Sequence, residues 1–413
     1  MSSMTTAYAE PAVGEFRRGW PVVLACFAVA TFAWGFGFYG QSVFLADLHA
    51  TRGWPSSLIA SATTVNYLMG AVLLTRVHRA IEVLGARLLL AGGVVAMAAG
   101  AIGLSRAQTP WELYVWSMVM ALGWAGTTTT AIAVTLALWF ERRRGLALSL
   151  ALTGASAGGF TIAPLLVHLA HGMGLERAVL LLALGGLAIL LPLVMAGVGG
   201  TAERGHAAGG AVTAHATAGW LTAFAGQGQA LRSLHFWSLA LPFALALAAQ
   251  VGFIVHQVAF LLPRLGSAGA GTAIAATAVA AALGRLAFAP LIDHLNQRIA
   301  AAASFASQAA GLALMLALPD APAALFVGCV VFGLSVGNVI TLPALIVQRE
   351  FAPQSFGLVV GLSSMVGQAT LAFGPTLLGL ARDATGSYGA SLGLCVALQV
   401  AAAIVVLAAR RIG

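Results

Sequence analysis

The sequence predicts an all-α membrane protein of twelve transmembrane helices, arranged as two pseudo-symmetric six-helix bundles. Of its 413 residues, 60% are hydrophobic and 8% are charged, and the mean hydropathy is +0.95. Soluble domains carry roughly 25% charged residues, so this chain has too little charge to cover a soluble fold. Apolar stretches of about 20 residues, the length that crosses a bilayer, recur along the whole chain between short charged segments.

Hydropathy, together with charged residues and Pro or Gly breaks, defines the individual spans. We place them at residues 20–46, 56–78, 86–105, 112–139, 146–169, 177–198, 236–262, 270–292, 299–318, 322–347, 356–381 and 387–409. Each span is expected to be a helix, because backbone polar groups inside lipid must be satisfied within the segment.

Four regions follow from these spans. Residues 1–19 are polar, lack a cleavable signal pattern and are predicted to be a cytoplasmic tail. Residues 20–198 form the N-terminal six-helix bundle, and residues 236–413 form the C-terminal bundle with a short tail. Residues 199–235, rich in Ala, Gly, Thr and His, are predicted to be a cytoplasmic linker.

The basic residues indicate how the chain is oriented. All 20 are arginine, and most fall on the side of the predicted topology that carries both termini. By the positive-inside rule this side is cytoplasmic. We therefore expect a multi-pass protein of a bacterial-type inner membrane with both termini in the cytoplasm.

Several functional classes are excluded at this stage. The pI is near 10.4, but no basic stripe with interleaved aromatic residues indicates nucleic-acid binding. Cys26, Cys329 and Cys395 lie within predicted spans and form no disulfide framework. The chain has neither a phosphate-binding loop nor the lysine that such a loop requires. We expect no metal or cofactor, and a monomer in the lipid bilayer.

The two halves resemble each other in sequence. Gly145 follows an arginine-rich loop, and Gly357 follows a second charged loop 212 residues later. Pro164 recurs as Pro375, 211 residues later. A near-constant offset close to half the chain indicates a duplicated six-helix unit. Parallel repeats of this kind place a solute site near the midplane between the halves.

One loop motif then identifies a family. Gly284-Arg285, followed by Asp293-His294-Leu295-Asn296-Gln297-Arg298, resembles the loop motif of the major facilitator superfamily. The matching loop of the first half keeps basic residues but has no Asp. The resemblance covers essentially the full chain and implies that such loops gate by ion pairing between helix ends. It implies this gating role for Asp293, Arg298, Arg76, Arg79, Arg142 and Arg143.

Within this superfamily the chain resembles the monocarboxylate and oxalate/formate carriers. The fifth span is similar to their signature in Trp139-Phe140-Glu141-Arg142-Arg143-Arg144-Gly145-Leu146-Ala147, and the first span in Arg18-Gly19-Trp20-Pro21. His256 and Arg285 also match residue types found at those places. The chain departs from the pattern at Ala281, where animal carriers have an Asp, and it lacks the lysines of the first and eleventh spans. One cation favours a monoanion, and the missing Asp leaves His256 or the acid's own carboxyl group to carry a proton.

Arg285 is the charged residue that stands out within a span. It lies about five turns beyond the preceding loop, and an intramembrane arginine usually marks a substrate pathway. No Asp or Glu lies in the middle of a span, so an anionic substrate would supply the counter-charge, and guanidinium suits bidentate binding of a carboxylate. The alternative is that Arg285 caps backbone carbonyl groups or pairs with Asp293.

His256 is the histidine that lies well inside a span. Its titration range would let it exchange a proton near neutral pH. The alternative is a neutral histidine that holds neighbouring helices together by hydrogen bonds. Other polar residues within spans are candidates to line the cavity, although a helix–helix hydrogen bond is the more frequent role of such residues. They are Tyr39, Gln41, Asn66, Tyr67, Gln257, Asn338 and Gln368.

The sequence thus favours a secondary active transporter of a small organic anion. We expect a proton-coupled monocarboxylate carrier that works by rocker-switch alternating access, with Arg285 binding the carboxylate. The alternative on the same fold is an efflux carrier for amphipathic or drug-like compounds, which would be expected to hold an acidic residue at mid-membrane. A membrane-embedded enzyme would show clustered His and Asp or Glu, and a transport-dead sensor would normally show an added soluble domain.

Overall fold

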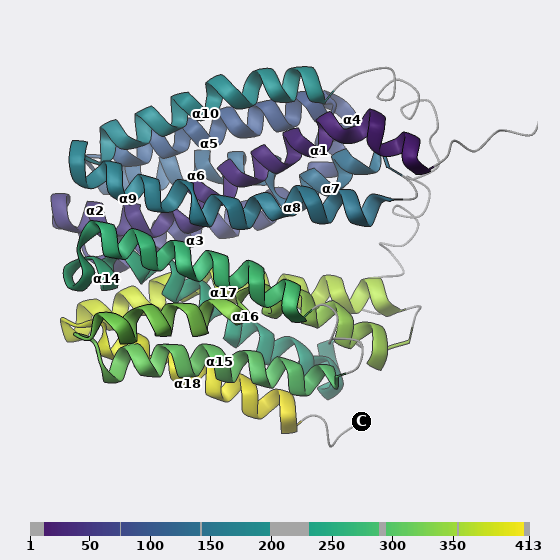
Figure 1. Cartoon of the computed structure of the whole chain (residues 1–413). Coiled ribbons are helices and arrows are strands. Elements are labelled where there is room, and N and C mark those ends of the chain that lie inside the picture. Colours follow the sequence, from purple (N-terminus) through teal and green to yellow (C-terminus); the bar gives the residue numbers. More distant parts are fainter. Residues whose placement is uncertain are drawn as a thin grey trace, which may run out of the picture.

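The computed structural model is an assembly of membrane-spanning helices (Figure 1). It describes residues 12–74, 76–140, 143–198, 231–288, 295–352 and 355–408. The predicted linker lies largely outside these ranges, and the gating residues Asp293 and Arg142 lie wholly outside them.

The N-terminal half contains ten α-helices and one π-helix in the described ranges. They are α1 (Ala12–Trp34), the π-helix η1 (Gly35–Tyr39), α2 (Gln41–Arg52), α3 (Ser56–Leu74), α4 (Val77–Leu84), α5 (Ala86–Arg106), α6 (Pro110–Thr127), α7 (Thr129–Ala137), α8 (Arg144–Phe160), α9 (Ile162–Met173) and α10 (Leu175–Gly197). The C-terminal half contains α14 (Leu234–Phe288), α15 (Gln297–Ala317), α16 (Pro322–Glu350), α17 (Phe356–Thr385) and α18 (Tyr388–Ala408).

The twelve predicted spans are confirmed. Eleven described segments are long and apolar enough to cross a membrane, and one of them, α14, is 55 residues long. Gly266 divides α14 into two helices, because its φ of 68° and ψ of 178° are not helical. Glycine adopts positive φ without the steric penalty of a side chain. The two arms of α14 therefore cross the membrane in opposite directions, as the seventh and eighth spans.

Three local features differ from a series of simple helices. The first span begins at Ala12, within the predicted tail, and passes through η1 before it continues as α2. The fourth span is interrupted at Thr128, whose backbone is extended. The fifth span is interrupted at Thr161, three residues before Pro164, because a proline removes one helical hydrogen bond and clashes with the preceding turn.

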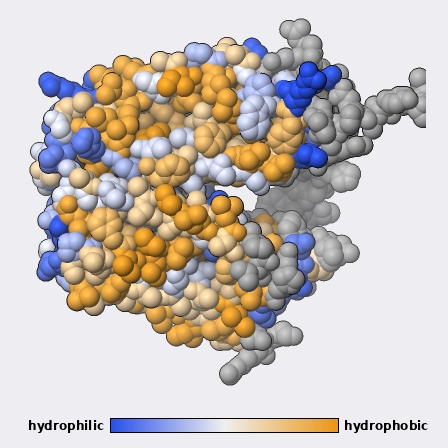
Figure 2. Space-filling model, viewed as in Figure 1, coloured by the Kyte–Doolittle hydropathy of each residue, from blue (hydrophilic) through white to orange (hydrophobic). Residues whose placement is uncertain are grey.

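The two halves meet at one end of the molecule and separate at the other. Contacts between the halves join α3 to α17, and join α14 to α2, α8 and α9. Figure 2 shows a hollow between the halves, on the right of the view, and hydrophobic residues over the outer faces. We call the end that carries Gly266 and the loop before α3 the closed end. The opposite end, where α14 begins and α18 finishes, is the open end (Figure 1).

A chain of three buried glutamines crosses the interior of the C-terminal half. Gln308 Nε2 donates to Gln250 Oε1 at 2.7 Å, and Gln399 Nε2 donates to Gln308 Oε1 at 2.6 Å. All three side chains are fully buried. These three side chains link α14, α15 and α18 through buried hydrogen bonds.

Candidate functional site

Arg285 lies on the second arm of α14, and its guanidinium group packs against α16. A side-chain carbon placed on Gly337 would lie 2.7 Å from Arg285 Nε and 3.0 Å from Arg285 Nη2. The Nε atom is buried and has no hydrogen-bond partner. Within the described residues, no carboxylate or carbonyl oxygen accepts a hydrogen bond from Arg285.

The position of Gly337 gives the depth of the guanidinium group. Gly337 lies near the middle of α16, about 22 Å from Pro322 and about 20 Å from Glu350 at 1.5 Å per residue. A helical side chain points back toward the start of its helix, so Arg285 reaches from near the end of α14 to this level. The positive charge is therefore held close to the midplane of the bundle.

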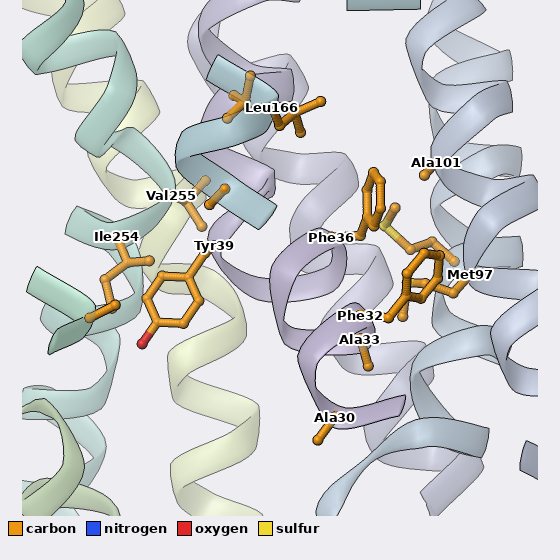
Figure 3. Close-up of a cluster of buried hydrophobic side chains, with 14 of the residues drawn as sticks. Ala30, Phe32, Ala33, Phe36, Tyr39, Met97, Ala101, Leu166, Ile254 and Val255 are labelled. Atoms are coloured by element: carbon orange, nitrogen blue, oxygen red, sulfur yellow. The ribbon is translucent and has the colours of Figure 1, made fainter. Parts of the chain in front are cut away.

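Tyr39 approaches the same region from the N-terminal half. Its ring lies between α8 and α14, since a side-chain carbon on Gly159 would touch both Ala278 and the Tyr39 ring at 2.7 Å. Figure 3 shows Tyr39 beside Ile254 and Val255 of α14, apart from the cluster around Phe36. Its hydroxyl is near enough to Arg285 for an electrostatic interaction. The π-helix places Tyr39 there, and such segments are frequent at functional sites.

Asn338 and Gln368 are two further predicted site residues, on α16 and α17. Asn338 follows Gly337 on α16 and is 5% exposed. Gln368 is half-buried on α17. No hydrogen bond to either side-chain amide is found in the part of the chain that the structure describes. Both amides therefore lack a protein partner among the described residues.

His256 lies toward the closed end and is engaged by two neighbouring helices. Its Nε2 is 2.9 Å from the carbonyl oxygen of Pro375, and its Nδ1 is 3.2 Å from the hydroxyl of Tyr388. A carbonyl oxygen only accepts, so Nε2 carries the proton and Nδ1 accepts from Tyr388. His256 is 1% exposed. These contacts match the structural alternative, a neutral histidine that joins α14 to α17 and α18.

Two predicted cavity residues are instead bonded within one half. Gln41 donates to the Met120 sulfur at 2.9 Å and accepts from Thr63 at 3.2 Å. Gln257 donates to Thr277 at 2.8 Å. Both side chains are almost fully buried. The sequence shows that both residues lie in membrane spans but not which way their side chains face. Because both side chains face the interior of one bundle, we assign neither to the substrate site.

Asn66 and Tyr67 on α3 present a different case. Asn66 is 1% exposed, and neither its Oδ1 nor its Nδ2 has a hydrogen-bond partner. The Tyr67 hydroxyl is likewise buried without a partner. Buried polar groups are normally satisfied. These two side chains therefore mark a polar position in the N-terminal half, separate from the contacts of Arg285.

The predicted gating residues fall into two groups at the open end. Arg298 is 3% exposed, and its Nε and Nη2 donate to Glu350 at 2.8 Å and 2.7 Å. This pair joins the start of α15 to the end of α16 within one half. Arg76, Arg79 and Arg143 are exposed, and the Arg143 backbone N–H donates to Glu15 at 3.3 Å.

Sequence reasoning missed the contacts that hold the closed end together. Asp383 of α17 accepts hydrogen bonds from the backbone N–H groups of Ser56 and Ser57, at 3.1 Å and 2.8 Å. Deeper along the same helices, the hydroxyls of Thr64 and Thr376 are 2.7 Å apart. The sequence does show an acidic residue at the end of one span and a pair of serines at the start of another. It does not show that they meet, because that depends on the fold.

Comparison with solved structures agrees with this architecture. A crystal structure of the nucleoside transporter NupG superposes with a TM-score of 0.72 at 12% identity, covering 94% of this chain and 98% of that one. A bacterial homologue of the human lysosomal transporter Spinster, in an inward-facing and occupied conformation, gives a TM-score of 0.70 at 15% identity, with 98% of both chains covered. At these identities the likeness shows the fold.

Sequence comparison identifies the family. The model of the Major Facilitator Superfamily matches residues 27–375. The chain is 30% identical to monocarboxylate transporter 11 of Mus musculus, over 95% of this chain and 87% of that protein. It is 27% identical to monocarboxylate transporter 13 of Rattus norvegicus, over 93% and 87%. The chain belongs to the Major Facilitator Superfamily, as a multi-pass membrane transporter rather than an enzyme, and within it resembles the monocarboxylate transporters.

Proposed function

We propose that this transporter carries small monocarboxylates, and that Arg285 binds the carboxylate group. The observation that carries the proposal is a guanidinium group near the midplane with no acidic partner among the described residues. A charge in the membrane interior is expensive unless it is paired. A carboxylate substrate supplies that pair and leaves a neutral complex.

The chemistry of the site favours an acid with a single negative charge. Guanidinium presents a planar fork of donors that matches the two carboxylate oxygens. Only one cation reaches this region among the predicted site residues, so a second carboxylate would remain unpaired. Tyr39, Asn338 and Gln368 offer hydroxyl and amide groups to the rest of a small polar acid. The names of the mammalian relatives agree with this substrate class.

We propose that the two halves alternate by rocking about this site. The described conformation is closed where α3 meets α17 and hollow at the other end (Figure 2). The arginine-rich end is the open one, and the positive-inside rule places it in the cytoplasm. This conformation is then the inward-facing state. Release of the contacts of Asp383 and Thr64 would open the opposite side.

We also propose that a proton crosses with the acid, so that the cargo is neutral overall. His256 is the interior histidine that sequence analysis offered as the proton acceptor. Both of its ring nitrogens are already bonded in the neutral form. The acid's own carboxyl group is then the proton acceptor: it binds Arg285 as the carboxylate and takes up the proton on leaving the guanidinium group, and His256 keeps a structural role.

The test is uptake of labelled lactate and pyruvate into proteoliposomes, with and without an inward proton gradient. Arg285→Gln removes the charge and one arm of the fork, which costs about 1.5–3 kcal/mol and should raise KM roughly 10- to 150-fold. Arg264→Gln is the matched control, because Arg264 lies on the same helix at the closed end and donates to the Phe260 carbonyl. Wild-type KM in Arg285→Gln would refute the assignment, and absence of acid uptake by wild type would redirect the search to efflux substrates.

A further inference from the structure

We propose that Gly337 is a positioning residue: because it has no side chain, the Arg285 guanidinium group can lie against α16, and this position sets the size of acid that the site accepts. The part of this inference that concerns substrate size rests on the proposed function. Its structural part, the position of Arg285, can be tested without any substrate.

The guanidinium group fills the space that a side chain at position 337 would need. The ideal Cβ position is 2.7 Å from Arg285 Nε, 3.0 Å from Nη2 and 3.2 Å from the carbonyl oxygen of Ala281. The first distance is shorter than any normal carbon contact. Arginine at 285 and a side chain at 337 are therefore incompatible in this arrangement.

The helices themselves cannot move apart easily to relieve such a contact. A Cβ on Gly284 would meet the carbonyl oxygen of Leu334, and one on Gly333 would lie 2.5 Å from the carbonyl oxygen of Thr277. The backbones of α14 and α16 thus approach each other closely at Gly333 and Leu334, about one turn before Gly337. Small residues permit this approach between membrane helices. The distance between the helices is fixed by these neighbours, and the end of the arginine side chain is the part that is free to shift.

The same contact determines which edge of Arg285 meets a ligand. Nε and Nη2 face Gly337, and Nε is fully buried. The edge of the guanidinium group that Nε and Nη2 form is therefore directed at α16. The two terminal nitrogens form the remaining edge, which is the one available for two parallel hydrogen bonds to a carboxylate.

Replacement of Gly337 by alanine would move the guanidinium group by a predictable amount. Nε must retreat about 0.7 Å to reach an ordinary contact of 3.4 Å, and it retreats away from α16. The space left for the acid shrinks accordingly. We expect KM for a branched or longer acid such as 2-oxoisocaproate to rise roughly tenfold, the low end of the effect of one methylene group in a pocket, with a smaller rise for pyruvate and little change in maximal rate.

The first experiment reads the position of Arg285 directly. Phenylglyoxal modifies accessible guanidinium groups, and mass spectrometry of the Arg285 peptide gives its rate of modification in the purified full-length protein. We expect Gly337→Ala to increase this rate several-fold. The control is Gly393→Ala in α18, where a Cβ meets no atom within 4 Å. An unchanged rate in Gly337→Ala would overturn the positioning role.

The second experiment reads selectivity, by the KM of each variant for pyruvate and for 2-oxoisocaproate in proteoliposomes. A larger rise for 2-oxoisocaproate in Gly337→Ala, with wild-type values in Gly393→Ala, supports the proposal. Equal KM values in Gly337→Ala and wild type would overturn the claim on substrate size. Failure of wild type to transport either acid would overturn the proposed function, while the modification rates would still decide the role of Gly337.

Discussion

Asp383 ties the two halves together at the closed end, and its replacement should shift the balance between the two conformations. The carboxylate accepts from two N–H groups in the first turn of α3, at 3.1 Å and 2.8 Å. These groups have no partner within the helix, and the start of a helix favours negative charge. Asp383→Asn removes the charge and leaves one acceptor oxygen for two donors.

The magnitude follows from the kind of contact. A helix-capping side chain contributes about 1 kcal/mol, and the exposure of Asp383 keeps the charge contribution toward the lower end. A loss of about 1 kcal/mol changes an equilibrium constant roughly fivefold. In Asp383→Asn, the ratio of molecules whose halves have separated at the closed end to molecules whose halves remain in contact there should therefore rise about fivefold.

Distances between spin labels on the two halves measure this ratio. The labels can be attached to cysteines introduced at Ala50 on α2 and Ala268 on α14, which are exposed positions of the closed end. The three native cysteines are buried. The long-distance population should grow in Asp383→Asn. Asp320→Asn is the control, because this exposed carboxylate at the same end has no hydrogen bond to the N-terminal half among the described residues. An unchanged distribution in Asp383→Asn, or an equal shift in the control, would refute the role of Asp383.

Three further variants test other parts of the account. Arg298→Gln leaves the carboxylate of Glu350, which is 30% exposed, without its arginine partner and should destabilise the protein by about 1.5–3 kcal/mol. A lower unfolding temperature in detergent measures this loss, and unchanged stability would contradict a structural pair. Gln308→Leu breaks the glutamine chain at its centre and should cost about 1–3 kcal/mol, whereas Gln250→Leu, which removes an end, should cost less. His256→Gln should retain gradient-stimulated uptake, and its loss would return His256 to the proton pathway.

The number of membrane spans could be predicted from sequence because the membrane fixes the length of an apolar span. The prediction succeeded even at α14, where Gly266 separates two spans within one continuous apolar region. The π-helix at Gly35–Tyr39 and the break at Thr128 could not be predicted. They depend on how the first and fourth spans pack against their neighbours, and no local charge or proline marks them.

The candidate site could be predicted in part for the same kind of reason. Arg285 was identified because a charge inside an apolar span is rare whatever the fold. Gln257 was selected because it is a polar residue within a span, but it faces a bundle interior and donates a hydrogen bond to Thr277. The direction that a polar side chain faces depends on the packing of its helix. The contribution of Gly337 follows from the approach of α16 to α14 and is invisible in the sequence.

Equilibrium binding of a labelled monocarboxylate to the purified protein tests the central claim most directly, since it needs no gradient and no turnover. Wild type and Arg264→Gln are expected to bind pyruvate equally, and Arg285→Gln is expected to bind it at least about tenfold more weakly. Equal binding by wild type and Arg285→Gln would contradict the claim that the unpaired guanidinium near the midplane is the carboxylate site.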